Sequence, residues 1–129
     1  MIDRRTRIII GWAGLLGLTA VAAGAFGAHG VADPRGKAWL QTGGEYGMIH
    51  ALAAITSLGV ARLGGRTAIA AAWCFLAGAT IFSGTLYAIA LTGILQFGAI
   101  TPIGGLLLLA GWALVAWAGF TLMPPETPN

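Results

Sequence analysis

The chain of 129 residues is 57% hydrophobic and only 9% charged, whereas about a quarter of the residues in a soluble domain are charged. This composition excludes an ordinary soluble domain and leaves no length for a soluble catalytic module. The net charge of +3 comes from basic residues that form no stripe with interleaved aromatics, so nucleic acid is not an expected partner. Cys74 is the single cysteine, which excludes an intrachain disulfide and a thiolate metal cluster.

Four apolar segments predict an all-α membrane protein, because each is long enough to cross a bilayer as a helix. The spans lie at about residues 8–28, 46–63, 67–92 and 102–123. They predict a four-helix transmembrane bundle that forms a single membrane domain over residues 1–129. A polar segment between spans one and two predicts a short interfacial helix over about residues 34–42.

Span one follows a cluster of arginines and carries a stripe of small residues. Basic residues before an apolar run also occur in secretory signal peptides. We expect a retained span instead, because the chain begins at Met1 and no soluble domain follows for export. Steps of three and four residues predict a face that packs closely on another helix: Gly14, Gly17, Val21, Gly24 and Ala28.

The segment between spans one and two carries signals for a helix start and a helix stop. Asp33 is a favourable N-cap, and Pro34 suits the first helical position. Gly43 and Gly44 predict that the helix ends there. This helix is expected to lie at the outer surface, with Trp39 dipping toward the acyl chains.

Spans two and three each place polar side chains in the outer half of the bilayer. Glu45 and Tyr46 are expected to begin span two, where the helix dipole favours a carboxylate. Counting residues along each span places His50 and Tyr87 at similar depths, on the order of 7–9 Å outside the midplane at 1.5 Å per residue. We therefore expect the His50 imidazole to hydrogen-bond to Tyr87 or Ser83.

Span three is expected to have a polar face and an apolar face. Small and hydroxyl-bearing residues share the arc that we expect to pack on other helices: Ala77, Thr80, Ser83, Gly84, Tyr87 and Ala88. The opposite arc is expected to meet acyl chains: Phe75, Phe82, Leu86 and Ile89. Gly93 predicts the helix end.

Span four repeats the small-residue spacing of span one. Thr101 is expected to cap its start, with Pro102 as the first helical residue. The predicted packing stripe contains Gly104, Leu108, Gly111, Val115 and Ala118. Tryptophans on spans one and four are expected to be interfacial anchors: Trp12, Trp112 and Trp117. The proline-rich tail that ends at Asn129 is expected to lack regular structure.

The basic residues predict the orientation of the chain. Five of them lie at span ends that meet on one side: Arg4, Arg5, Arg7, Arg62 and Arg66. The other two, Arg35 and Lys37, lie on the opposite side near Asp33 and Glu45. Because positive residues concentrate in cytoplasmic loops, both termini are expected to be cytoplasmic, that is, N-in and C-in.

Five blocks of sequence together resemble one known family. They are G-A-F-G-A-H-G at 24–30, W-L-Q-T-G-G-E-Y at 39–46 followed by His50-Ala51-Leu52-Ala53, F-S-G-T-L-Y at 82–87, I-T-P-I-G-G at 100–105 and G-W-A-L at 111–114. In this order they resemble the small membrane proteins grouped as domain of unknown function 423, which include the YgdD-like bacterial proteins. The resemblance covers nearly the whole chain and implies a four-span protein of the cell inner membrane. It implies no established biochemical activity.

A candidate polar cluster at the outer side combines seven residues: His29, Glu45, Tyr46, His50, Ser83, Tyr87 and Thr101. A hydrogen bond between helices is the simplest role for His50, because a polar side chain in hydrocarbon needs a partner. His29 is expected to interact with the carbonyls at the end of span one. Alternatively, the two histidines are axial ligands to a haem between spans one and two, or line a quinone site. No catalytic residue, cofactor-binding residue or metal ligand is assigned.

Enzyme motifs and mid-span charges are both missing from the sequence. We therefore expect a non-enzymatic structural or interaction component that packs with lipids, other membrane proteins or copies of itself. The alternative is a small channel or carrier whose path follows the hydroxyls of span three: Thr80, Ser83, Thr85, Tyr87 and Thr92. These hydroxyls can instead bond to carbonyls of their own helix.

Overall fold

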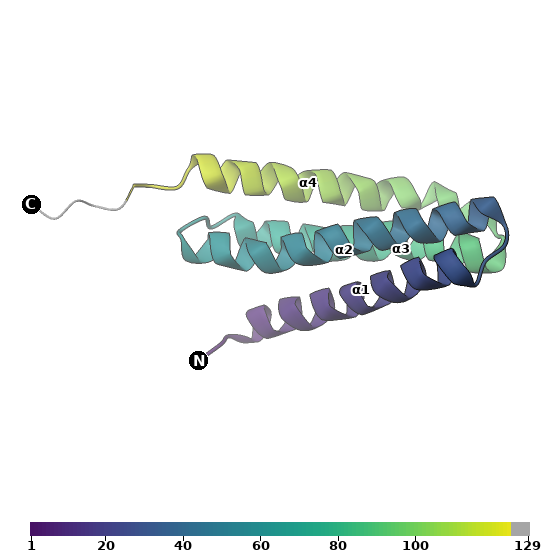
Figure 1. The fold of residues 1–129 in the computed structure, drawn as a ribbon. Helices are drawn as coiled ribbons and strands as arrows, with labels where there is room; N and C mark the ends of the chain where they lie inside the picture. Colours follow the sequence, from purple (N-terminus) through teal and green to yellow (C-terminus); the bar gives the residue numbers. More distant parts are fainter. Residues whose placement is uncertain (125–129) are drawn as a thin grey trace, which may run out of the picture.

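The computed structural model describes residues 1–124, which form four α-helices and one 3-10 helix. The helices are α1 (Arg4–His29), α2 (Pro34–Arg62), α3 (Ala68–Thr92), η1 (Leu95–Ala99) and α4 (Thr101–Phe120). Figure 1 shows that successive α-helices run in opposite directions, so α1 begins at the end of the bundle where α4 stops. Within these residues, α1 and α4 lie on opposite sides of the α2–α3 pair and do not contact each other. The predicted tail lies largely outside the described residues.

Three segments of the described chain are long and apolar enough to cross a membrane: Arg4–His29, Ala68–Thr92 and Leu95–Phe120. The all-helical class is therefore confirmed, with three of the four expected spans supported by length and composition. α2 is not among them, because its first half is rich in glycine and polar residues. Its crossing stays a prediction.

The prediction of a separate interfacial helix over residues 34–42 is wrong, because α2 continues without a break from Pro34 to Arg62. Gly43 and Gly44 do not stop the helix; they bring it close to its neighbours. A Cβ at Gly43 would lie 2.6 Å from the Tyr87 ring, and one at Gly44 would lie 3.0 Å from the Ala20 carbonyl oxygen. Close packing on α1 and α3 therefore outweighs the weak helix propensity of these glycines.

The buried face of α1 is not the glycine stripe that the spacing predicts. It contains Ile9, Ala13, Leu16, Ala20 and Gly27. A Cβ at Gly14, Gly17 or Gly24 would meet no atom within 4 Å. The buried face combines alanines, which allow close approach, with Ile9 and Leu16, which fill the core. A stripe of glycines has no side chains to bury and would gain fewer contacts there.

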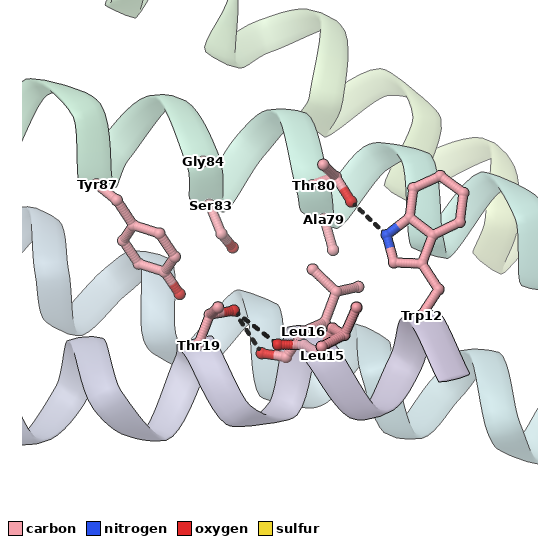
Figure 2. Close-up of a pocket in the computed structure, with 9 residues that line it drawn as sticks. All are labelled: Trp12, Leu15, Leu16, Thr19, Ala79, Thr80, Ser83, Gly84 and Tyr87. Carbon is pink, nitrogen blue, oxygen red and sulfur yellow. Dashed lines mark hydrogen bonds between the residues drawn. The ribbon is translucent and has the colours of Figure 1, made fainter. Parts of the chain in front are cut away.

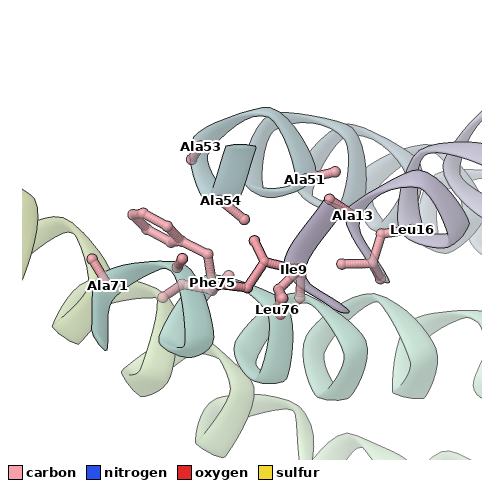
Figure 3. Close-up of a cluster of buried hydrophobic side chains, with 12 residues drawn as sticks. Ile9, Ala13, Leu16, Ala51, Ala53, Ala54, Ala71, Phe75 and Leu76 are labelled. Carbon is pink, nitrogen blue, oxygen red and sulfur yellow. The ribbon is translucent and has the colours of Figure 1, made fainter. Parts of the chain in front are cut away.

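The predicted apolar face of α3 is buried except at Phe82, which is half-buried, because α3 packs against all three other α-helices. Phe75 is completely buried, and Leu86 and Ile89 are 8% and 4% exposed. Figure 3 shows Phe75 and Leu76 among alanines of α2 and α3 and the Ile9 side chain of α1. The expectation that this face meets acyl chains is therefore wrong.

The predicted stripe of α4 is confirmed as its packing face. Gly104, Leu108, Gly111 and Ala118 are all buried. Two of its glycines allow direct contact with α3, because a Cβ at Gly104 would lie 2.5 Å from the Phe82 nitrogen and one at Gly111 would lie 2.6 Å from the Phe75 ring.

The helix ends follow most of the expected capping signals. The Asp33 carboxylate accepts a hydrogen bond from the Gly36 N–H at 2.8 Å, and Pro34 occupies the first helical turn. Gly93 ends α3 in the left-handed conformation, with φ of +71°. Thr101 does not cap α4; Ile100 precedes the helix, and Thr101 is its first residue.

Candidate functional site

His50 lies inside the bundle, and both of its ring nitrogens have partners. The residue is 5% exposed. Its Nδ1 lies 2.7 Å from the Tyr46 carbonyl oxygen, and its Nε2 lies 3.1 Å from the indole nitrogen of Trp112. A carbonyl oxygen only accepts and an indole N–H only donates, so these partners assign a neutral ring with the proton on Nδ1. The predicted bond from His50 to Tyr87 or Ser83 is therefore wrong, and the partner is Trp112 on α4.

The depths of the two side chains explain this difference. His50 lies two residues from residue 48, the middle of α2, which corresponds to about 3 Å along the axis. Tyr87 lies seven residues from residue 80, the middle of α3, which corresponds to about 10 Å. A span that begins at residue 46 places the two residues at one level, but α2 begins twelve residues earlier, at Pro34.

An apolar groove opens between α2 and α4 on the side where His50 lies. Its volume is about 710 Å³, and it is lined by Tyr46, Ile49, His50, Phe82, Pro102, Gly105, Leu106, Leu108, Leu109 and Trp112. The rings of Tyr46 and Phe82 lie 4.5 Å apart, and those of Phe75 and Trp112 lie 5.0 Å apart. The bond between Trp112 and His50 joins α4 to α2 beside this groove.

Ser83 and Tyr87 lie on the other side of α3, in a pocket between α3 and α1. Figure 2 shows both side chains extending from α3 toward Thr19 and Leu16 of α1. Both hydroxyl oxygens are buried, and each would lie 3.3 Å from a Cβ at Gly47 of α2. The predicted cluster is therefore divided, with His50 facing α4 and the two hydroxyls facing α1.

The remaining hydroxyls of α3 do not form one continuous path. Thr80, Thr85 and Thr92 each donate to a carbonyl of their own helix. Thr85 also lies 2.7 Å from the Thr101 hydroxyl, which joins α3 to α4 away from the Ser83 pocket. This arrangement favours packing over a hydroxyl-lined channel.

His29 and Glu45 are exposed and lie apart from His50. His29 is the last residue of α1. Glu45 is the twelfth residue of α2, so the dipole at the start of a helix does not account for it as expected. The His50 ring packs on Phe75 of α3 and Trp112 of α4, whereas the proposed haem would lie between α1 and α2. This geometry does not fit a haem held by the two histidines.

Two tryptophans that were expected to be interfacial anchors make hydrogen bonds within the bundle. Trp112 donates to His50, and Trp12 donates to the Thr80 hydroxyl at 3.0 Å. For Trp112 a signal exists in the sequence, because the middle of an apolar span is too deep for an interfacial ring. An indole N–H at that depth needs an acceptor from another helix.

Known proteins with similar sequences are membrane proteins of uncharacterised activity. Residues 23–105 match the family described as a protein of unknown function, DUF423. The UPF0382 inner membrane protein YgdD of Escherichia coli K12 is 42% identical over 116 residues, which cover 85% of this chain and 87% of YgdD. The UPF0382 membrane protein SH2409 of Staphylococcus haemolyticus is 42% identical over 120 residues, which cover 88% of this chain and 93% of the relative. The UPF0382 membrane protein YwdK of Bacillus subtilis is 40% identical over 106 residues, which cover 78% of this chain and 86% of YwdK. No solved structure matches the chain.

Proposed function

The chain belongs to the DUF423 family of membrane proteins, and from this premise we propose that it is a four-span component of the inner membrane that associates with other helices through α1 and α2. The antiparallel order of the helices supports the fourth crossing. α1 ends at one end of the bundle and α3 begins at the other, so α2 returns the chain across the same distance (Figure 1). Five basic residues lie at the end where α1 begins, which supports a cytoplasmic location for both termini.

The uncovered glycine stripe of α1 is the observation that carries this proposal. Gly14, Gly17 and Gly24 have open space where a Cβ would lie, and Val21 between them is 60% exposed. In lipid, helices associate through small residues that let backbones approach, since hydrophobic drive between helices is weak. α4 uses its equivalent stripe to bind α3. Within the described chain, the stripe of α1 meets α2 at Gly24, whose nitrogen would lie 3.5 Å from a Cβ at Gly44, but it has no partner at Gly14 and Gly17.

Polar residues of α2 continue this surface. A groove of about 540 Å³ joins the two helices, lined by Ala20, Val21, Gly24, Gln41, Gly44, Glu45, Met48 and Ile49. Glu45 lies one turn from Gln41 along the exposed face of α2 and three residues from the middle of that helix. A carboxylate that faces lipid near this depth is costly, so a partner helix that donates hydrogen bonds would stabilise it.

Oxidative cross-linking in native membranes tests the association. A Val21→Cys variant made with Cys74→Ser places one thiol on the stripe. We expect a specific disulfide with the same thiol of a second copy or with a cysteine of another membrane protein. Adding Gly17→Leu should abolish the adduct, whereas Gly119→Leu should not, because both glycines have the same open space but Gly119 lies on α4. An adduct yield no higher than that of Leu106→Cys, which is 67% exposed on α4, contradicts the proposal.

A further inference from the structure

A pocket opens at the end of the bundle where α1 begins and α4 stops (Figure 1), between the α2–α3 turn and the last turn of α4. Its volume is about 520 Å³. It is lined by Leu63, Gly64, Arg66, Thr67, Trp117, Thr121 and Met123. The pocket therefore combines one cationic side chain with an indole, two hydroxyl groups and apolar side chains.

Two contacts fasten the α2–α3 turn to α4 and fix the shape of this pocket. The Thr67 hydroxyl donates to the Leu114 carbonyl oxygen at 3.2 Å. Gly65 is buried, and a Cβ at this position would lie 3.1 Å from the Cβ of Ala118. Arg66 lies between these two contacts in the sequence, so its backbone is held at the level of the last turns of α4.

The pocket lies at the depth of lipid headgroups. With residue 80, the middle of α3, at the midplane of the bilayer, Arg66 lies fourteen residues away, which corresponds to about 20 Å. Half of a bilayer consists of about 15 Å of hydrocarbon followed by headgroups out to about 20–22 Å. The exposed Arg66 guanidinium therefore meets phosphate groups. The exposed Trp117 ring, in the last turn of α4, meets the ester groups and the first carbons of the acyl chains.

The charges around the pocket favour an anion. Arg62, in the last turn of α2, lies four residues before Arg66, and both side chains are exposed. The carboxylates of the described residues lie elsewhere in the molecule. Asp3 caps α1, across the α2–α3 pair from α4, and Asp33 and Glu45 belong to the opposite half of the bundle. A phosphate in the pocket would gain charge-assisted hydrogen bonds from a guanidinium.

We propose that this pocket binds the headgroup of an anionic phospholipid, with the phosphodiester on Arg66 and the acyl chains along the apolar surface of α4. Basic pockets beside membrane helices bind anionic headgroups, and each Lys or Arg near the membrane surface adds to the attraction. A zwitterionic headgroup carries an amine that the charges of Arg62 and Arg66 repel, so the pocket selects lipids with a net negative charge. The site lies across the bundle from the α1 stripe and does not rest on association through α1.

Titration of the full-length protein in uncharged micelles with dioctanoyl phosphatidylglycerol tests this inference. Dioctanoyl phosphatidylcholine is the matched probe, because it has the same chains and a phosphodiester but no net charge. Methyl resonances of Leu63 and Met123 report on the pocket. We expect saturable shifts with phosphatidylglycerol and about five-fold weaker binding of phosphatidylcholine. Inorganic phosphate should produce no saturable shift, because it has no acyl chains.

Two arginine substitutions separate this site from a general attraction between basic residues and anionic lipid. Arg66→Gln should weaken the binding of phosphatidylglycerol about five-fold, and its melting temperature should be unchanged because the side chain is exposed. Arg4→Gln removes the same charge from the start of α1, which does not contact α4, and should leave the affinity nearly unchanged because solvent and salt screen a distant charge. Repeating both titrations with Glu126→Gln removes the carboxylate outside the described residues as a competitor.

Three results would overturn the inference. Equal affinities for the two lipids would show that the headgroup charge is not recognised. Equal losses for Arg66→Gln and Arg4→Gln would show that the attraction is spread over the surface. Saturable shifts of the same methyl groups with inorganic phosphate alone would show an anion site that does not need a lipid.

Discussion

Replacing Gly104 by alanine tests the contact between α3 and α4. A Cβ at this position would lie 2.5 Å from the backbone nitrogen of Phe82 and 2.8 Å from the carbonyl oxygen of Gly78. Both are backbone atoms, so only a movement of α4 away from α3 relieves the clash. The next residue, Gly105, is a matched control, because its Cβ would meet the Phe82 ring at 3.9 Å, an ordinary contact.

The two substitutions differ only in this packing cost. Glycine to alanine inside a helix gains about 1 kcal/mol of helix propensity in both variants. Gly104→Ala also incurs an overpacking cost of about 1–3 kcal/mol. We therefore expect Gly104→Ala to change the free energy of unfolding by between zero and a loss of about 2 kcal/mol, and Gly105→Ala to raise it by up to about 1 kcal/mol.

Circular dichroism of the purified proteins in one detergent, heated at one scan rate, measures the difference. Gly105→Ala should melt at a higher temperature than Gly104→Ala, with the wild type between them or equal to the less stable variant. Equal melting temperatures for the two variants, or a higher value for Gly104→Ala, would refute the close approach of α4 to α3 at this position.

Two further predictions concern a hydrogen bond in the bundle and a helix cap. Trp112→Phe should lower the free energy of unfolding by about 0.6–1.7 kcal/mol, because His50 Nε2 loses its donor; chemical denaturation in micelles measures this, and Trp117→Phe, at a site 62% exposed, should have little effect. Hydrogen bonds from the side chain and backbone of Thr6 lower the pKa of Asp3, the N-cap of α1. The cap therefore stabilises the first turn above the ordinary carboxyl pKa, and this contribution is lost as pH falls through the lowered value. Cα chemical shifts of the first turn should follow this titration in the wild type but not in Asp3→Asn.

Helix ends could be predicted where the signal depends on neighbours in sequence. Asp33 caps α2 through an N–H three residues later, and Gly93 ends α3 because it adopts a positive φ. Gly43 and Gly44 are glycines like Gly93, but they do not end a helix. Their missing side chains allow close contact with helices that are distant in the sequence. Sequence alone does not separate these roles, since both need only the absence of Cβ.

The position of the polar groups depends on the helix ends in turn. A span over residues 46–63 predicts that His50 lies outside the midplane, at the level of Tyr87, whereas the full length of α2 places His50 near the middle of that helix. Trp112 is the twelfth of the twenty residues of α4, at a comparable depth. An indole donor and an imidazole acceptor at one level of a dry bundle each need the other, because lipid supplies no hydrogen bonds. Ser83 and Tyr87 lie on the other side of α3 and face α1, so neither hydroxyl can replace Trp112 as the partner of His50.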